Sequence, residues 1–251
     1  MNPLDLEEVK QYVNVHIVEF HQHRIASLEQ LTIDRLLQKN PYLFKAKHIV
    51  KPWDLIDELL TAFLSSSEEK LFGDFLEDLA IFIAEKTCGG HKSATPGVDL
   101  EFLHANRHYL VSIKSGPHWG NSSQHKRLAQ DLREAVIRVK QSKTASTPEP
   151  VLGICYGKTR TVHTKDGYLK VVGQNFWYLI SKNKSLYTDI VEPIGYRARE
   201  HNERFESERD RIIRRFTKEF LDRFCNADLE IDWVKLVEFN SANFDLDEFS
   251  L

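Results

Sequence analysis

Residues 96–124, PGVDLEFLHANRHYLVSIKSGPHWGNSSQ, are the most informative part of the sequence for the fold, because the hydrophobic pattern changes twice within them. VDLEFL and HYLVSIKS predict two strands, which the polar turn HANR joins. These strands carry an aspartate, a glutamate and a lysine where a plain core strand would carry none. An unpaired charge in an apolar layer costs several kcal/mol in desolvation. We therefore expect the charged residues to serve a purpose.

The charged residues of these strands are spaced so that they can meet. Residues two apart on a strand point to the same face of the sheet, so Asp99 and Glu101 share one face. Ser112 and Lys114 share one face of the next strand. If the strands pair as a hairpin with these faces coincident, two carboxylates, a hydroxyl and an ammonium group converge. Two carboxylates can hold a divalent cation and a lysine can orient a water, which phosphodiester hydrolysis requires.

A further acid lies on the helix predicted before these strands, SSSEEKLFGDFLEDLAIFIAEKTCGG. One row of this helix holds Glu77 among the small residues Gly73, Ala80 and Ala84. Small residues let a helix approach a sheet closely, which would bring the Glu77 carboxylate near Asp99. A surface acid on an amphipathic helix is an equally good interpretation of Glu77, as a strand-edge surface residue is of Glu101.

The rest of the chain alternates between helical and strand patterns. Apolar residues at threes and fours predict helices from the N-terminus to a stop before Pro41, and again over KPWDLIDELLTAFL. A separate helix with a serine cap follows from about residue 65. After the two strands, SSQHKRLAQDLREAVIRVKQSK predicts a helix. VLGICYG and LKVVGQNFWYLIS predict further strands with a turn at Asp166–Gly167, and helices follow over about 197–224 and around WVKLVEF.

This order of elements predicts an α/β fold, with a sheet core, a helical N-terminal extension and C-terminal helices. We expect residues 1–66 to form the helical N-terminal region. Residues 67–251 would form the core with its C-terminal helices, in one continuous domain.

Composition narrows the class of protein. The 251 residues are 41% hydrophobic and 28% charged, as in an ordinary soluble globular protein. A run of about 18 apolar residues is absent, so we expect no membrane span, and the N-terminus has no pattern of a secretory signal. The three cysteines lie far apart without a CxxC motif, which indicates reduced thiols in a cytoplasm and no zinc site.

Local charge is uneven although the net charge is only −3. Acids dominate residues 51–79, and bases dominate residues 107–143. The basic stretch could follow phosphates with salt-sensitive affinity, but a solvated helix face is the simpler interpretation of charge alone. In residues 197–224 the arginines alternate with acids at helical spacing, which favours ion pairs within the helix over DNA contact.

The segment SGPHWGNSSQ follows Lys114 directly and is a candidate for contact with nucleic acid. Its glycines and proline bend the backbone, Ser122 or Ser123 would cap the next helix, and the free N–H groups there suit a phosphate. A structural turn with a buried tryptophan is at least as good an interpretation. Basic residues of that helix and of the loop YGKTRTVHTKDGYLK extend the candidate surface. The candidate DNA-binding residues are His118, Trp119, Asn121, Ser123, Gln124, Lys126, Arg127, Lys158 and Arg160.

These residues resemble a known group of enzymes. Asp99, a strand-turn-strand spacer and then Ser112-Ile113-Lys114 resemble the PD-(D/E)xK nuclease superfamily. The full stretch GVDLEF…YLVSIKSGPHWGNSSQ is similar to type II restriction endonucleases in particular. GQNFWYLIS and EPIGYRAREHN are also similar, so the resemblance spans about residues 68–241, and the N-terminal helices contribute less.

The resemblance implies a restriction-endonuclease-like core, that is, a mixed central sheet flanked by helices. It also implies a Mg²⁺-dependent cut in double-stranded DNA that leaves a 5′-phosphate, and a homodimer that reads a short site. Asp99 would then be the central metal ligand and Lys114 the catalytic lysine, and Glu77 would match a helix acid that some members use. A cognate DNA methyltransferase is expected as a genetic partner.

The sequence departs from this family pattern at two points. Pro96 lies three residues before Asp99 instead of next to it, and Ser112 stands where a second acid is expected. A serine hydroxyl is a poorer metal ligand than a carboxylate, so another acid must supply an oxygen or the metal site is weaker. The candidates, in order, are Glu101, then Glu77, then Asp131 or Glu134 of the following helix.

Three other functions stay open at this point. The first is a repair or recombination nuclease that reads DNA structure and not sequence. The second is a DNA-binding protein of the same fold that lost catalysis when the acid became Ser112. The third is a helical interaction module with an incidental sheet, which leaves the spacing of Asp99 and Lys114 unexplained.

Overall fold

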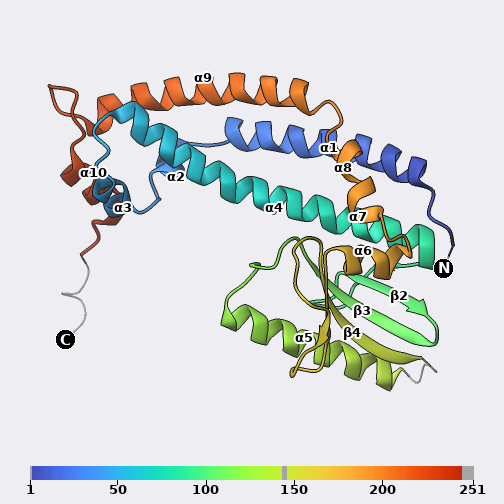
Figure 1. Ribbon diagram of the computed structural model, residues 1–251. Coiled ribbons are helices and arrows are strands. Elements are labelled where there is room, and N and C mark those ends of the chain that lie inside the picture. Colours follow the sequence, from blue (N-terminus) through green and yellow to red (C-terminus); the bar gives the residue numbers. More distant parts are fainter. Residues whose placement is uncertain (1, 143–145, 245–251) are drawn as a thin grey trace, which may run out of the picture. The chain divides into compact units, whose positions relative to one another are not determined.

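The computed structural model describes residues 2–142 and 146–244 (Figure 1). These residues form two compact units. The first comprises the chain up to Phe20 together with Leu71–Ala198, and the second comprises His21–Lys70 together with the chain from Arg199 on. The long helices α1 (Leu6–Glu29) and α4 (Pro52–Cys88) therefore each contribute residues to both units.

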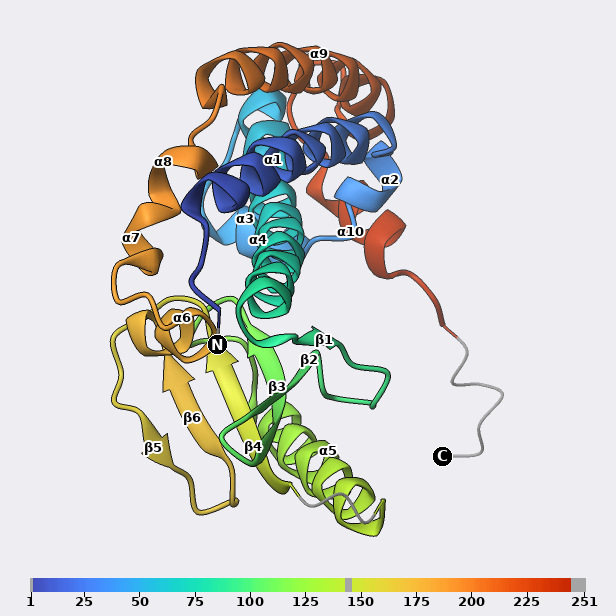
Figure 2. The same ribbon diagram turned by 90° about the vertical axis from the view of Figure 1, so that its right-hand side faces the viewer.

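A mixed six-stranded sheet in the order β1-β2-β3-β4-β6-β5 forms the centre of the first unit. β1, β2 and β3 are antiparallel, β3, β4 and β6 are parallel, and β5 returns antiparallel to β6, as Figure 2 shows from the side. This arrangement confirms the predicted α/β class with a mixed sheet. The strands are β1 (His91–Lys92), β2 (Leu100–His104), β3 (Arg107–Lys114), β4 (Thr147–Ile154), β5 (Val162–His163) and β6 (Leu169–Val172).

Different helices pack on the two faces of this sheet, because alternate strand residues point to opposite sides. Phe102 and Val111 belong to a core with the C-terminal part of α4, the N-terminal part of α1 and α6 (Gln174–Ser181). Leu110 belongs to the core that covers the other face, with α5 (Ser122–Gln141) (Figure 1). Two short helices, α7 (Leu186–Asp189) and α8 (Val191–Ile194), complete the first unit.

The second unit is helical. It contains α2 (Ile33–Leu36), α3 (Pro41–Ala46), α9 (Ala198–Phe224), α10 (Trp233–Ser241) and the remaining parts of α1 and α4. One face of α9 is buried in a single apolar core at helical spacing. The charged face of α9 carries ion pairs between residues three or four apart, as predicted: Arg199–Glu203, Arg211–Glu208 and Arg223–Glu219.

Two secondary-structure predictions are wrong. LKVVGQNFWYLIS is not one strand, because β6 ends at Val172 and α6 begins at Gln174. Gly173 has a φ of +57°, a left-handed conformation that favours glycine, and the apolar residues after it follow a helical period. The helix predicted to start at a serine cap is part of the 37-residue helix α4. Inside α4 the Ser66 hydroxyl donates to the carbonyl of Ala62, so this serine is accommodated within the helix.

Within the residues that the structure describes, no helix is both long and apolar enough to cross a membrane. All three cysteines, Cys88, Cys155 and Cys225, are free thiols.

Candidate active site

Asp99 and Lys114 meet at the end of the β2–β3 hairpin. Leu100 pairs with Val111, and the N–H of Asp99 donates to the Val111 carbonyl, so Asp99 lies beside the C-terminal part of β3. Lys114 Nζ lies 3.5 Å from Asp99 Oδ2, with side chains that are 30% and 22% exposed. The predicted convergence of these two residues on one face is confirmed.

Oδ2 of Asp99 is held by groups from β3. It accepts a hydrogen bond from the backbone N–H of Ile113 at 2.6 Å and one from the Ser112 hydroxyl at 3.3 Å. Among the residues that the structure describes, the other oxygen, Oδ1, accepts no hydrogen bond. Ser112 is almost completely buried and occupies the position of the expected second acid. In this chain it donates to the first acid and adds no charge.

The Lys114 ammonium group is fixed from three sides. It donates to the carbonyl of Ile113 at 2.7 Å and lies near the Asp99 carboxylate. It also lies 5.9 Å from the ring centroid of Trp119, which contacts His125 edge to face at 4.3 Å. A cation at this distance from a tryptophan face is attracted by the ring. The partly buried Trp119 therefore has a structural role beside the lysine.

Glu77 of α4 lies within electrostatic reach of both residues. Burial raises the pKa of its carboxyl group, and the negative charge of Asp99 raises it further, against the opposing charges of Lys92 and Lys114. Lys92 Nζ lies 3.6 Å from the Glu77 carboxylate and 3.4 Å from that of Asp78. The Glu77 carboxylate therefore interacts electrostatically with the pair formed by Asp99 and Lys114.

Glu101 is held by other partners. Its Oε1 accepts hydrogen bonds from the hydroxyls of Ser93 and Thr95, and its Oε2 lies 2.8 Å from Nε2 of His108. Burial raises the pKa of the Glu101 carboxyl group, but the hydrogen bonds from Ser93 and His108 outweigh burial, so the net shift is downward. No spacing or motif in the sequence marks Lys92, Ser93, Thr95 and His108, so their place beside these acids was not predicted.

The two acids of α5 differ in their surroundings. The Asp131 side chain packs on Gly97 so closely that a Cβ at Gly97 would lie 2.4 Å from the Asp131 Cβ. Asp131 is therefore next to the turn that precedes Asp99. Glu134 accepts a hydrogen bond from Gln130 and pairs with Arg138 along the same helix. We therefore find no contact that links Glu134 to Asp99 or Lys114 among the described residues.

Asp99 and Glu77 carry carboxylate oxygens, which are the type of ligand that Mg²⁺ prefers. Within residues 2–142 and 146–244, no group of three or more His, Cys, Asp or Glu side chains is arranged to hold a metal ion. Mg²⁺, however, commonly uses one or two carboxylates and completes its shell with waters and substrate phosphate oxygens. Burial, and then the negative charge of Asp99, raises the pKa of the Glu77 carboxyl group, and a divalent cation bound by these carboxylates would offset this unfavourable ionisation.

The N-terminus of α5 is capped by Asn121, so the predicted cap at Ser122 or Ser123 is wrong. The Asn121 side chain accepts from the N–H groups of Ser123 and Gln124, and the Gln124 side chain accepts from the Asn121 N–H. Asn121 is favoured as the cap over the serines that follow it, because Gln124 lies three residues after Asn121 and completes a reciprocal capping box. Two N–H groups expected to bind a phosphate are therefore already bonded.

The other candidate DNA-binding residues are mostly accessible. His118, Ser123, Lys126 and Arg127 are exposed on the segment that follows β3 and on the first turns of α5. Lys158 and Arg160 are exposed between β4 and β5. Lys158 also lines a mainly apolar cavity of about 530 Å³.

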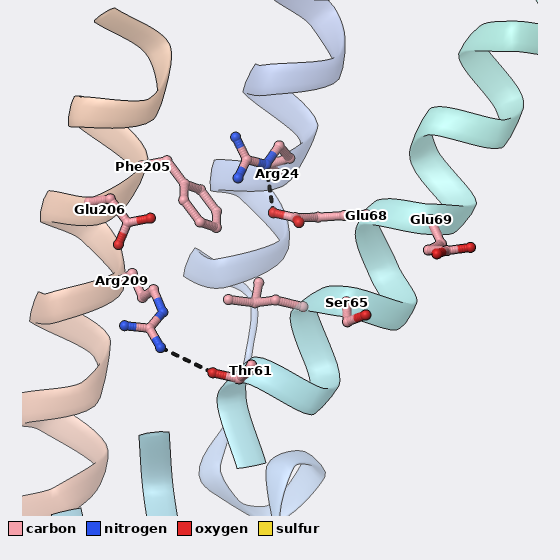
Figure 3. Close-up of a pocket in the computed structure, with 9 residues that line it drawn as sticks. Arg24, Thr61, Ser65, Glu68, Glu69, Phe205, Glu206 and Arg209 are labelled. Atoms are coloured by element: carbon pink, nitrogen blue, oxygen red, sulfur yellow. Dashed lines mark hydrogen bonds and ion pairs between the residues drawn. The ribbon is translucent and has the colours of Figure 1, made fainter. Parts of the chain in front are cut away.

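A second cavity, of about 500 Å³, lies in the second unit between α1, α4 and α9 (Figure 3). Arg24 Nε donates to Glu68 at 2.7 Å, and the Arg24 guanidinium lies 3.8 Å from the centroid of the Phe205 ring. Arg209 donates to the Thr61 hydroxyl at 3.1 Å and pairs with Asp57. Since both arginines that line this cavity are paired, we assign it a structural role in helix packing.

A comparison with known protein families matches residues 7–202 to the family described as type II restriction endonuclease EcoO109I. A search of curated proteins gives no match. The match covers most of the chain and includes all six strands, Glu77, Asp99 and Lys114. It also begins within α1, so the N-terminal helices belong to the similarity more fully than the resemblance in sequence indicated. The chain belongs to the EcoO109I family of type II restriction endonucleases.

Proposed function

We propose that this protein is a Mg²⁺-dependent restriction endonuclease that cuts both strands of double-stranded DNA at a short site and leaves 5′-phosphates. Membership of the family supports DNA cleavage in general. The observation that carries the chemistry is the contact of 3.5 Å between Lys114 Nζ and Asp99 Oδ2, with Glu77 close enough to respond to both charges.

We assign Asp99 and Glu77 as the carboxylates that would hold the cation. A divalent cation at this place would offset negative charge on the scissile phosphate and favour ionisation of a water. Glu77 is preferred over Glu101 as the second acid, because Glu77 is coupled to Asp99 and Lys114 whereas both oxygens of Glu101 have hydrogen-bond partners. Ser112 would keep Asp99 in place through its hydrogen bond.

Lys114 would orient the attacking water and stabilise negative charge on the phosphate in the transition state. Water oxygen forms the new bond to phosphorus, the bond from phosphorus to the 3′ oxygen breaks, and that oxygen leaves with a proton. The phosphate then stays on the 5′ side. The carbonyl of Ile113 and the ring of Trp119 would hold the ammonium group in the required position.

The exposed basic residues Lys126, Arg127, Lys158 and Arg160, with His118, are proposed to contact the DNA. Trp119, Asn121, Ser123 and Gln124 would support this surface, the last three through the capping box. We propose a homodimer, since two-fold symmetry suits a site that is cut on both strands. We also propose action in the cytoplasm, where a cognate DNA methyltransferase would protect the host sites.

Digestion of plasmid and phage DNA with and without Mg²⁺ tests this function. We expect discrete fragments with Mg²⁺, and we expect Asp99→Asn and Lys114→Ala each to lower the rate at least about 100-fold while the proteins stay folded. Asp78→Asn is the matched control, because Asp78 lies next to Glu77 and pairs with the same lysine, Lys92. It should cleave like the wild type.

The pattern of digestion separates the alternatives. A smear or nicked circles would indicate a nuclease that reads DNA structure. Salt-dependent retardation of DNA without cleavage would indicate a binding protein that lost catalysis with the acid at position 112. Full activity of either Asp99→Asn or Lys114→Ala would show that the active site lies elsewhere.

A further inference from the structure

We propose that Glu101 is a positioning residue of this active site, which holds the segment 93–98 against β2 and so fixes Asp99, instead of binding the metal itself. The inference rests on the proposed function, in which Asp99 is a metal ligand. From sequence spacing alone, Glu101 is the first candidate to replace the acid that is missing at position 112. The structure assigns it a different role.

Both carboxylate oxygens of Glu101 are engaged. Oε1 accepts from the hydroxyls of Ser93 and Thr95, and Oε2 contacts the ring of His108. The Glu101 side chain is only 14% exposed. To bind a cation, Glu101 would have to give up hydrogen bonds in a partly buried place, which is costly.

The segment that these bonds hold is otherwise weakly attached. β1 has two residues, which pair with Glu101 and Leu100. The next rung is a hydrogen bond of 3.0 Å from the Ser93 N–H to the carbonyl of Asp99. Asp99 is therefore held by β3 on one side, through its N–H, and by Ser93 on the other. A two-residue edge strand has few backbone hydrogen bonds of its own. The hydrogen bonds to Glu101 therefore stabilise the contact between Ser93 and the Asp99 carbonyl.

The turn after Ser93 depends on the same residues. The Ser93 hydroxyl accepts from the Thr95 N–H at 2.9 Å, and the Thr95 carbonyl accepts from the Val98 N–H at 3.0 Å. Gly97 has a φ of +76° and closes the turn. This chain of contacts runs from Glu101 to the residue just before Asp99, so displacement of Glu101 propagates to the Asp99 backbone.

The same cluster also reaches the second proposed acid. Lys92 precedes Ser93 on β1, and its ammonium group lies 3.6 Å from the Glu77 carboxylate. Release of β1 would therefore move the Lys92 ammonium group away from the Glu77 carboxylate. From β3, His108 supports Glu101 at 2.8 Å, so Glu101 links three neighbouring strands.

Comparison of Glu101→Gln with Glu101→Ala tests the proposal. Glutamine can accept both hydroxyl hydrogen bonds through its oxygen and donate to the His108 ring through its amide, but it lacks the charge of a metal ligand. We expect Glu101→Gln to cleave within a few-fold of the wild type. Glu101→Ala should lower kcat by about 10- to 100-fold, because three hydrogen bonds are lost, with little change in KM for DNA. Glu77→Gln removes the charge of a proposed metal ligand and, in contrast to Glu101→Gln, should abolish cleavage.

Hydrogen exchange supplies a readout that needs neither metal nor DNA. Amides of residues 93–99 should exchange faster in Glu101→Ala than in the wild type and at the wild-type rate in Glu101→Gln. Ser93→Ala should reproduce part of the change. Calorimetric titration with Mg²⁺ should show reduced affinity for Glu77→Gln and unchanged affinity for Glu101→Gln.

The outcomes distinguish the two proposals. Loss of both cleavage and Mg²⁺ affinity in Glu101→Gln, with normal exchange over residues 93–99, would make Glu101 a ligand and overturn the inference. Wild-type exchange and cleavage in Glu101→Ala would overturn it as well. If the wild type does not cleave DNA at all, the proposed function fails, and faster exchange in Glu101→Ala alone would still support the role of Glu101 in holding Asp99.

Discussion

At the scale of single residues, Ser112 is where the chain departs from the PD-(D/E)xK pattern that its sequence resembles. A buried hydroxyl that donates to Asp99 takes the place of an acid, so the first acid is better fixed while one negative charge is missing. In the proposed site, Glu77 of α4 would supply that second negative charge. The partial burial of Glu77 next to Asp99 then makes it a group whose ionisation is unfavourable in the folded protein without a cation.

This unfavourable ionisation predicts a pH-dependent effect of Glu77→Gln on stability. A carboxyl group with a raised pKa in the folded state stabilises the protein at low pH, and this contribution is lost as the pH rises through the folded pKa. Without metal, Glu77→Gln should therefore be more stable than the wild type at pH 7, and the difference should vanish below the unfolded pKa near 4.5. Urea unfolding at both pH values measures it, and a variant that is less stable at pH 7 would contradict the prediction.

The contact between Asp99 and Lys114 was predictable because strand alternation and a short hairpin together fix which side chains share a face. The partners of Glu101 were not predictable. Ser93 and Thr95 precede β2 in an irregular segment, and only the tertiary path of that segment brings their hydroxyls to the carboxylate.

At the scale of elements, the cap of α5 accounts for residues that also look suited to DNA contact. We expect Asn121→Ala to lower the free energy of unfolding by about 1 kcal/mol, because the N–H groups of Ser123 and Gln124 lose their acceptor. Asn121→Ser should keep most of the stability, since serine also caps helices. Ser122→Ala is the control on the neighbouring residue and should change little. Chemical denaturation of the three variants makes the comparison.

DNA binding of the same variants separates capping from recognition. If Asn121 acts through the cap, Asn121→Ser binds DNA like the wild type. A loss of affinity in Asn121→Ser with unchanged stability would instead assign a direct contact with DNA.

The elements themselves were predictable where the hydrophobic period is long and regular, as in α5, α9 and the β2–β3 hairpin. Prediction failed at LKVVGQNFWYLIS, because only Gly173 separates the four strand residues from the eight helical residues. The left-handed Gly173 marks the boundary, and its conformation is a property of the folded backbone. β1 and β5 have only two residues each, too few to show any period.

At the scale of the whole molecule, electrostatic attraction to DNA should be concentrated on a few exposed cations. If Lys158 and Arg160 each neutralise a phosphate, the double variant Lys158→Ala/Arg160→Ala should weaken binding to all DNA sequences. It should also reduce the slope of log affinity against log salt by about 2. Fluorescence anisotropy without Mg²⁺, between about 50 and 200 mM NaCl, measures this slope.

The matched control removes the same charge elsewhere. Arg214→Ala/Lys218→Ala alters two exposed cations of α9 and should leave the slope unchanged. An equal decrease in both double variants would show that net charge, and not a local contact, governs the attraction.

The sheet ends at both sides in a strand of two residues, β1 and β5. Such short borders offer a second chain almost no row of unpaired backbone amides and carbonyls on which to continue the sheet. Edge strands this short therefore disfavour aggregation by β-sheet extension at high protein concentration. Any stable pairing of two copies would have to be built from side chains.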